Sequence, residues 1–345
     1  MVDVRKLPLD EGWVLIPRER TARPHDFRPA EAVRLPTRCP FCAGHESETP
    51  TQLAVYPPAA TGGWQVRVVP NKYPAIGPLP RARRAHAKHS PSADRETKVL
   101  PAGDPRDPLS SHTAGQGLHE VVIESPRHVA RFADLTPLQT RYTLRAYRDR
   151  VREHRTDARL AYSLVFRNSG ITGGASLEHV HSQIIATPWI PSAVTTELRH
   201  ARAWHERTER CLFCELMERE LADGRRIVAQ SRSFVAWCPY ASRFAYETWI
   251  APRQHRSDFE SSSDRLLAEF ARLLQDVVAR IEGLPGPPGY NFWIHTAPFS
   301  LADSRFYHWH LEITPRLNFQ AAFEWGGGDY INALPPEEAA AALRW

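Results

Sequence analysis

The sequence lacks any long run of apolar residues. No stretch of its 345 residues approaches the roughly 18 uninterrupted apolar residues that a membrane-spanning helix needs. Residues 1–20 carry aspartate, glutamate and arginine where a secretory signal would need an apolar segment. We therefore expect a cytoplasmic protein with no membrane partner.

The sequence also carries only a small net positive charge. The formal net charge is +5, and residues 81–89 contribute +4 of it without a single acidic residue. The rest of the chain is nearly neutral, which argues against a broad nucleic-acid-binding face. We expect no nucleic-acid partner.

Cysteine is also rare, with five in the chain. In a cytoplasmic protein such cysteines are not expected to form disulfides. Four of them stand in two C-x-F-C pairs, Cys39/Cys42 and Cys211/Cys214, and 16 histidines are available as further ligands. Metal binding is therefore the first hypothesis for the pairs, whereas Cys238 is expected in the core.

The composition, 42% hydrophobic and 24% charged, is that of a globular protein with one large domain or two smaller ones. Alternating and β-branched residues predict strands, and apolar residues at helical spacing predict one long helix in each half. The first half gives strands at 12–17, 64–69, 119–124, 162–167 and 179–186 and a helix at 137–154. The second half gives strands at 234–237, 247–251, 290–295 and 308–314 and a helix from 263 or 264 to 281. We expect an α+β fold built from two similar halves.

The chemically distinctive residues repeat in the same order. His128 precedes His179 by 51 residues, and His255 precedes His308 by 53 residues. A duplicated domain explains this agreement better than chance. We predict an N-terminal domain over residues 1–195 and a C-terminal domain over residues 196–345. Residues 78–117, rich in proline, serine, arginine and glycine, are expected to be a mobile insertion in the first domain.

The repeat predicts two metal sites. Two thiolates spaced C-x-x-C bind one metal ion from a tight turn, and two distant imidazoles complete a closed tetrahedral shell of the kind that holds structural zinc. A lone C-x-x-C could instead be a redox pair or two buried small residues. We predict two structural Zn²⁺ sites, one with Cys39, Cys42, His128 and His179 and one with Cys211, Cys214, His255 and His308.

Each half carries an H-x-H pair on a predicted strand. Residues two apart face the same side of a strand, so a metal bound by His179 would leave His181 free to face a substrate. An imidazole whose other nitrogen is hydrogen-bonded is a nucleophile toward phosphorus. Gln183 can donate its amide to a phosphate oxygen, and the small residues before Ser176 would let phosphates approach backbone amides. The alternative is a pair of metal-binding histidines without catalysis.

These residues form part of a longer pattern. His179-Val-His-Ser-Gln183 resembles the H-P-H-x-Q motif of the galactose-1-phosphate uridylyltransferases, a branch of the histidine-triad superfamily, with valine in place of proline. The similarity continues in order through residues 20–24, 39–42, 69–74, 168–170, 174–178, 308–312, 323–326 and 330–332. The resemblance implies two duplicated histidine-triad (HIT-like) domains whose antiparallel sheets are fused and flanked by helices, with catalysis in the N-terminal one.

The same resemblance implies a covalent mechanism. His181 would attack the α-phosphorus of a nucleoside diphosphate sugar, release a sugar 1-phosphate and leave a nucleotidyl-histidine that passes its nucleotide to a second acceptor. Gln183 would hold phosphate oxygens beside it. The substrate-binding residues that the resemblance implies are Arg20, Arg23, Asn71, Asn168, Ser176, Phe323 and Glu324, the last two delivered across a homodimer.

By this resemblance the protein is a transferase of galactose metabolism that moves UMP between UDP-glucose and galactose 1-phosphate. An ADP-glucose phosphorylase or a dinucleotide hydrolase of the same fold would use the same chemistry, and a zinc-stabilised nucleotide-binding protein without turnover would be of another class. His310 would be a degenerate counterpart of His181, because Glu312 stands where Gln183 does and its charge would repel phosphate.

Overall fold

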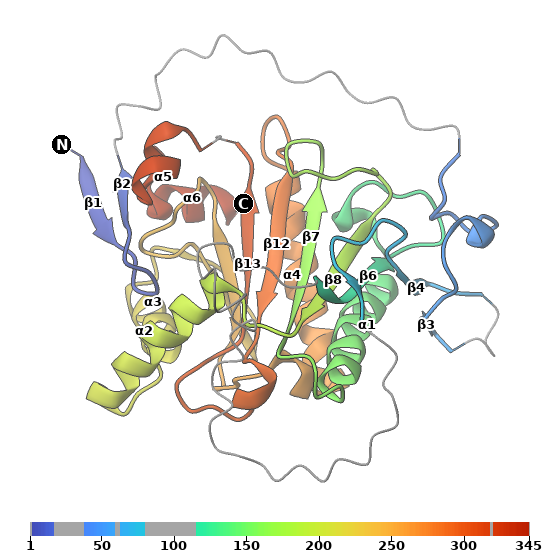
Figure 1. The fold of residues 1–345 in the computed structure, drawn as a ribbon. Helices are drawn as coiled ribbons and strands as arrows, with labels where there is room; N and C mark the ends of the chain where they lie inside the picture. Colours follow the sequence, from blue (N-terminus) through green and yellow to red (C-terminus); the bar gives the residue numbers. More distant parts are fainter. Residues whose placement is uncertain (1, 17–37, 59–62, 80–114, 318–319, 345) are drawn as a thin grey trace, which may run out of the picture.

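The computed structural model describes residues 2–16, 38–58, 63–79, 115–317 and 320–344. One large sheet runs through the molecule, with helices on its faces and a small sheet at one side (Figure 1). This arrangement confirms the α+β prediction. Among the described residues, no helix combines the length and the apolar character needed to cross a membrane.

The large sheet is ordered as two mirrored halves. From edge to edge its main path is β3 (Ala54–Tyr56), β4 (Val66–Pro70), β6 (Gln116–Ile123), β8 (His181–Thr187), β7 (Tyr162–Ser169), β12 (Tyr290–His295), β13 (His310–Pro315), β11 (Thr248–Pro252), β10 (Phe234–Trp237) and β9 (Ile227–Gln230). All neighbours along this path are antiparallel, and β5 (Gly77–Pro78) pairs in parallel with β6. The two strands that carry the H-x-H motifs, β8 and β13, occupy equivalent places in the two halves.

The halves are joined by one strand pair. Strands β7 and β12 run antiparallel with Phe166 opposite Trp293 and Asn168 opposite Asn291. The ten strands of the main path thus form one continuous sheet, and the prediction of fused antiparallel sheets is confirmed. A continuous sheet also carries one face of β8 directly onto the corresponding face of β13.

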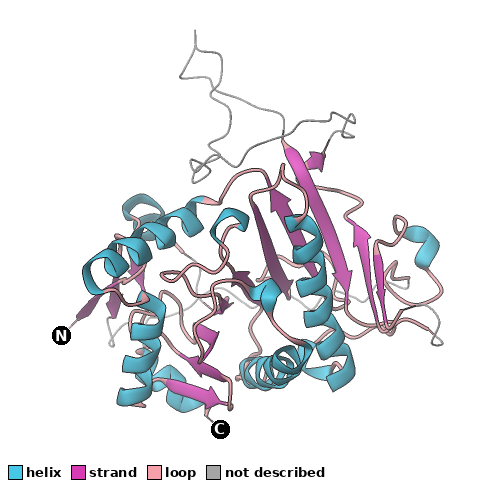
Figure 2. Cartoon of the chain, turned by 90° about the horizontal axis from the view of Figure 1, so that it is seen from below, coloured by secondary structure: helices cyan, strands magenta, loops and turns pink. Residues whose placement is uncertain are grey.

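One face of this sheet is covered by the two predicted long helices, α1 (Pro137–Arg155) and α4 (Asp264–Glu282), which contact each other (Figure 2). Each begins at a capping hydroxyl: Thr136 accepts from Gln139 N in a full capping box, and Ser263 accepts from Leu266 N. Their apolar stripes, with Leu144 and Leu274 fully buried, pack against the sheet to form the main core.

The opposite face is covered only in part, by helices that the sequence patterns did not reveal. Helices α2 (Ser192–Thr208) and α3 (Leu212–Asp223) pack on the C-terminal half of the sheet, where Trp237, Trp249 and Phe213 belong to a second core cluster. Short 3₁₀ helices lie at Glu46–Glu48, Phe132–Asp134, Phe259–Ser261 and Phe299–Leu301.

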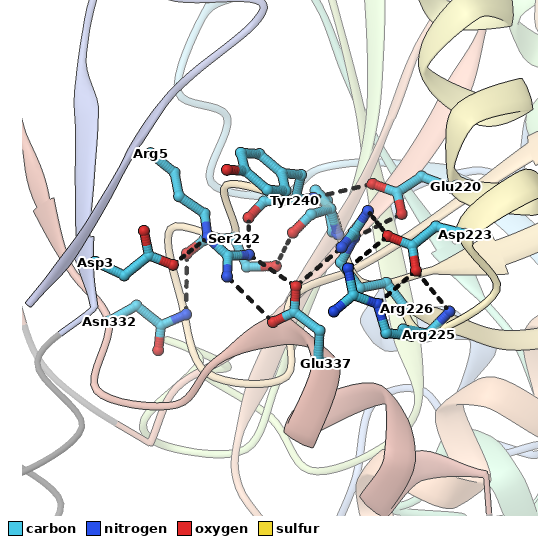
Figure 3. Close-up of polar contacts among 11 residues, drawn as sticks. Asp3, Arg5, Glu220, Asp223, Arg225, Arg226, Tyr240, Ser242, Asn332 and Glu337 are labelled. Atoms are coloured by element: carbon cyan, nitrogen blue, oxygen red, sulfur yellow. Dashed lines mark hydrogen bonds and ion pairs between the residues drawn. The ribbon is translucent and has the colours of Figure 1, made fainter.

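A small sheet ties the two ends of the chain together. Strands β1 (Asp3–Lys6) and β2 (Trp13–Ile16) form a hairpin that pairs in parallel with β14 (Tyr330–Ile331), next to helices α5 (Ala322–Gly327) and α6 (Pro336–Leu343). Arg5 donates to Glu337 on α6 at 3.0 Å, and Arg226 donates to the same carboxylate at 2.9 Å (Figure 3). The β1–β2 hairpin is therefore attached to the C-terminal half. The domain limits 1–195 and 196–345 stay a prediction.

The predicted insertion at residues 78–117 lies mostly outside the described residues. Its first residue, Pro78, belongs to β5, and its last two, Gln116 and Gly117, belong to β6. A Cβ at Gly117 would come within 2.3 Å of the Ala186 carbonyl oxygen, so this position in β6 requires glycine.

Candidate active site and metal centres

The first Cys/His group comes together as the spacing predicted. Cys39 and Cys42 lie in a turn closed by the Cys42 N to Cys39 O hydrogen bond, and the ligand atoms of both cysteines, His128 and His179 all lie within 4.8 Å of one another. The Cys39 Sγ to His179 Nδ1 distance is 3.5 Å, and Cys42 Sγ is 3.6 Å from Nδ1 of each histidine. This donor set fits a tetrahedral metal ion.

The surroundings orient these ligands. His179 Nε2 donates to the Ser125 carbonyl oxygen at 2.9 Å, which leaves the Nδ1 lone pair pointing at the sulfurs. Burial and the neighbouring Cys39 raise the pKa of Cys42 to about 11 in the absence of a cation. A bound cation would stabilise both thiolates, because it supplies the charge that this pair lacks.

The second group repeats the first on different local structure. Cys211 is the N-cap of α3, Cys214 lies in its first turn, and their sulfurs meet His255 and His308 within the same 4.8 Å limit. Cys214 Sγ is 3.4 Å from His255 Nδ1 and 3.3 Å from His308 Nδ1. Hydrogen bonds from Cys214 and the two imidazoles lower the pKa of Cys211, which favours the thiolate. This donor set also fits a metal ion.

His181 follows the first group by two residues and is held as a neutral imidazole. Its Nδ1 donates to the His179 carbonyl oxygen at 2.8 Å, and because a carbonyl only accepts, the lone pair is on Nε2. Burial, with the nearby Arg167 guanidinium, lowers the pKa of His181 and keeps the ring uncharged. The Phe41 ring packs against it with centroids 5.3 Å apart. The structure thus presents an unprotonated ring nitrogen of fixed orientation.

Gln183 shares the face of His181, and the structure surrounds it with polar groups. Its Oε1 is 2.7 Å from Nε2 of His119 on β6 and 3.5 Å from Nδ2 of Asn71. Asn71, a predicted substrate contact, therefore lies beside Gln183. His119 was not among the predicted site residues, because a single histidine in an alternating strand gives no signal that separates it from an ordinary polar residue.

Two further predicted residues come from β7 and from the loop that follows it. Asn168 follows Phe166, which is opposite Gln183 across β7 and β8, and its Oδ1 accepts from Asn291 at 2.8 Å. Ser176 is exposed in the loop that connects β7 to β8, between Gly174, whose φ is +79°, and His181. A left-handed glycine here lets the loop reverse direction just before the histidines.

Phe323 and Glu324, two other predicted substrate contacts, lie apart from His181 within one chain (Figure 1). Phe323 is exposed on α5, and Glu324 Oε2 accepts from Ala321 N at the start of that helix. Helix α5 lies near the β1–β2 hairpin, on the far side of β13 from β8 (Figure 1). Arg20 and Arg23 lie outside the described residues.

The C-terminal counterpart of the active face carries a different set of groups. His310 Nε2 and His295 Nδ1 lie 3.3 and 3.5 Å from Glu312 Oε1, and His295 Nδ1 is 2.9 Å from Glu197. Arg243 forms an ion pair with the other oxygen of Glu312. Burial alone would raise the pKa of Glu312, but the Arg243 guanidinium and the two histidines outweigh burial and hold this pKa below its usual value. The four acidic and imidazole groups also lie close enough together to ligate a metal ion.

A cavity of about 510 Å³ opens over this counterpart. Its walls include Trp237, Trp249, Trp293 and Arg316, and it reaches Asn168 at the junction of the halves. Glu197 and His295 were not among the predicted site residues, because they come from α2 and β12 and only the folded sheet brings them to His310.

Comparison with known proteins agrees with this geometry. The family model described as "Galactose-1-phosphate uridyl transferase, N-terminal domain" matches residues 65–191. An ADP-glucose phosphorylase of Arabidopsis thaliana is 32% identical over 99% of this chain and 92% of its own length. A galactose-1-phosphate uridylyltransferase of Thermotoga maritima is 28% identical over 100% of this chain and 98% of its own.

Solved structures show the same fold. A crystal structure of an ADP-glucose phosphorylase from Arabidopsis thaliana with bound ADP-glucose superposes with a TM-score of 0.81 at 30% identity, covering 100% of this chain and 98% of that one. A uridylyltransferase structure gives a TM-score of 0.70 at 29% identity, with 100% and 97% coverage. The chain therefore belongs to the galactose-1-phosphate uridylyltransferase family of HIT-like proteins, which includes the plant ADP-glucose phosphorylase.

Proposed function

We propose that the protein is a nucleotidyltransferase that uses His181 as its nucleophile. The observation that carries this proposal is the hydrogen bond from His181 Nδ1 to the His179 carbonyl, which leaves the Nε2 lone pair free beside Gln183. In the first step, Nε2 attacks the α-phosphorus of a nucleoside diphosphate sugar. The bond to the bridging oxygen breaks, and the sugar 1-phosphate leaves with the electron pair.

The His179 carbonyl stabilises the positive charge that develops on the ring, because it accepts from Nδ1 throughout the reaction. Gln183 and Ser176 hold phosphate oxygens, and Asn71 and Asn168 contact the nucleotide or the phosphate. In the second step an oxygen of the acceptor attacks the same phosphorus, and His181 leaves with its lone pair restored. Each step exchanges one phosphorus bond for another, so no external oxidant or base is required.

We propose Zn²⁺ for both Cys₂His₂ groups. Four protein ligands close the shell, so the metal offers no open position for water and its role is structural. In the first group it would fix His179 and, through the carbonyl of that residue, the ring of His181.

For the donor and acceptor we propose ADP-glucose and orthophosphate as the first candidate. The support is the full-length similarity to an ADP-glucose phosphorylase in sequence and in fold. UMP transfer between UDP-glucose and galactose 1-phosphate, which the sequence analysis placed first, remains the second candidate. It is favoured by the family model and by the uridylyltransferase relatives. In either case we propose a homodimer in which Phe323 and Glu324 reach the partner's sugar site.

The test is a panel of ADP-, UDP- and GDP-glucose, each offered with orthophosphate or galactose 1-phosphate, using the zinc-loaded full chain. ADP-glucose consumed with orthophosphate supports the first candidate, and UDP-glucose consumed with galactose 1-phosphate supports the second. Binding of a nucleotide sugar with no exchange of label into its sugar 1-phosphate would show a binding protein without turnover and would refute the proposed mechanism.

A further inference from the structure

His119 contacts Gln183 from the neighbouring strand. We propose that His119 is a positioning residue that holds the Gln183 amide with its NH₂ group toward the reacting phosphate. This inference rests on the proposed function, because it assigns a task to the amide of Gln183. His119 itself would not touch the nucleotide, and it would act only through Gln183.

The tautomer of His119 follows from its backbone partner. The Ala75 N–H lies 3.0 Å from His119 Nδ1, and since a backbone N–H can only donate, Nδ1 must be the accepting nitrogen. A neutral ring then carries its proton on Nε2, which lies 2.7 Å from Gln183 Oε1 and donates to it. Burial lowers the pKa of His119, in keeping with a neutral ring.

Asn71 adds a second donor to the same oxygen. Its own amide is oriented by Tyr73 N, which donates to Asn71 Oδ1 at 2.8 Å. Nδ2 is therefore the group that faces this pair, 3.1 Å from His119 Nε2 and 3.5 Å from Gln183 Oε1. Because a protonated His119 Nε2 cannot accept, both N–H groups are directed at Gln183 Oε1. The amide nitrogen of Gln183 has no hydrogen-bond partner among the described residues.

The direction of the amide matters for catalysis. An NH₂ group aimed at a phosphate stabilises the negative oxygens of the transition state, whereas a carbonyl oxygen in that place repels them. Gln183 has no intrinsic preference between the two orientations, because its terminal torsion is roughly two-fold. The contact from His119 selects the productive one.

In the C-terminal half, the residues equivalent to Gln183 and His119 are also connected, but by an ion-pair bridge. Glu312 takes the register place of Gln183, and Glu247, two residues before Trp249, takes that of His119. There Arg243 bridges the two carboxylates. In each half, therefore, hydrogen bonds or ion pairs from neighbouring segments fix the side chain at this strand position. The N-terminal half does so with a neutral donor that leaves an amide N–H group free.

The test separates the two nitrogens of His119. Asparagine places its amide oxygen near the position of Nδ1 and can keep the Ala75 contact, but it is too short to reach Gln183. Glutamine places its amide near Nε2 and can still donate to Gln183. We would measure nucleotidyl-enzyme formation at saturating nucleotide sugar, together with substrate affinity, for His119→Asn and His119→Gln, each alone and combined with Gln183→Ala. Melting curves would check the fold.

We expect His119→Asn to slow nucleotidyl transfer by about 10- to 100-fold, the loss typical of residues that orient a functional ligand, with a smaller change in affinity. His119→Gln should keep most of the wild-type rate. In the Gln183→Ala background, His119→Asn should cause no further loss, because the two residues act as one unit.

Three results would overturn the inference: a wild-type rate for His119→Asn, equal losses for the asparagine and glutamine variants, or an undiminished effect of His119→Asn in the Gln183→Ala background. Failure of the wild-type chain to form any nucleotidyl-enzyme would instead refute the proposed function. That outcome would also remove the basis for a role of His119.

Discussion

Replacing one cysteine of the first metal group should destabilise the protein in a way that depends on metal. Cys39 is 5% exposed, and its Sγ lies 3.5 Å from His179 Nδ1. In Cys39→Ser the thiolate ligand is gone and zinc no longer holds the 39–42 turn against His179. The matched control is Cys238→Ser, because Cys238 is fully buried and lies outside both groups, with Thr248 Oγ1 at 3.9 Å as its hydrogen-bonding neighbour.

The two losses should differ in cause and in size. A metal present at a thousandfold above its dissociation constant, and bound only by the folded state, stabilises the fold by about 4 kcal/mol. Cys39→Ser should lose about this much. Placing a hydroxyl where the buried Cys238 thiol stood should cost about 1–3 kcal/mol.

Chelation distinguishes the two mechanisms. In denaturant unfolding with a chelator, the gap between wild type and Cys39→Ser should shrink to the cost of the substitution itself, because both proteins then lack the first metal. The gap between wild type and Cys238→Ser should stay the same. Metal analysis should return two zinc ions per wild-type chain and one per Cys39→Ser chain. Two metals in Cys39→Ser, or a chelator-independent gap for that variant, would refute the assignment.

The remaining predictions concern the buried charges, the second half and the assembly. Glu120→Gln should cost about 3–5 kcal/mol at pH 7, because it removes the buried carboxylate 2.6 Å from the buried Arg150 guanidinium and leaves that charge with the exposed Glu153 as its partner. Burial alone would raise the pKa of Glu120, but hydrogen bonds from the buried His154 imidazole and from Arg150 hold this pKa below its usual value. The wild-type advantage in urea unfolding should therefore be complete above about pH 4.3 and decline as the pH falls below it, and a constant gap down to pH 3 would contradict this. His310→Ala should keep most of the exchange between nucleotide sugar and sugar 1-phosphate, and loss of exchange would place catalysis in the wrong half. Mixing inactive His181→Ala with inactive Glu324→Ala should regain part of the activity, because a hybrid dimer holds one complete site, and no recovery would argue against a shared site.

The parts of the fold that repeat could be predicted from the sequence. The matched spacing from His128 to His179 and from His255 to His308 predicted two equivalent halves, and the sheet places β8 and β13 at mirrored positions. The long helices were predicted nearly to the residue, because both start at a capping hydroxyl and carry a continuous apolar stripe. Local periodicity and spacing are properties of the sequence itself.

What was missed depends on contacts between distant segments. Helices α2 and α3 lack the capping hydroxyl that marks the start of α1 and α4, and Cys211 is the N-cap of α3 rather than part of an isolated turn. His119 meets Gln183 only because β6 and β8 are neighbours in the sheet, and Glu197 meets His295 only after α2 folds back onto β12. Strand register and helix docking set these contacts, and no local pattern encodes them.

The most direct test of the central claim is to trap and locate the covalent intermediate. The zinc-loaded chain would be mixed briefly with a nucleotide sugar labelled with ³²P at the α-phosphorus, quenched at alkaline pH to preserve the phosphorus–nitrogen bond, digested and mapped. We predict one acid-labile nucleotidyl group per chain on His181, absent from His181→Ala and retained by His310→Ala. Label on His310 or on any other residue, or label that persists in His181→Ala, would contradict this assignment of the nucleophile.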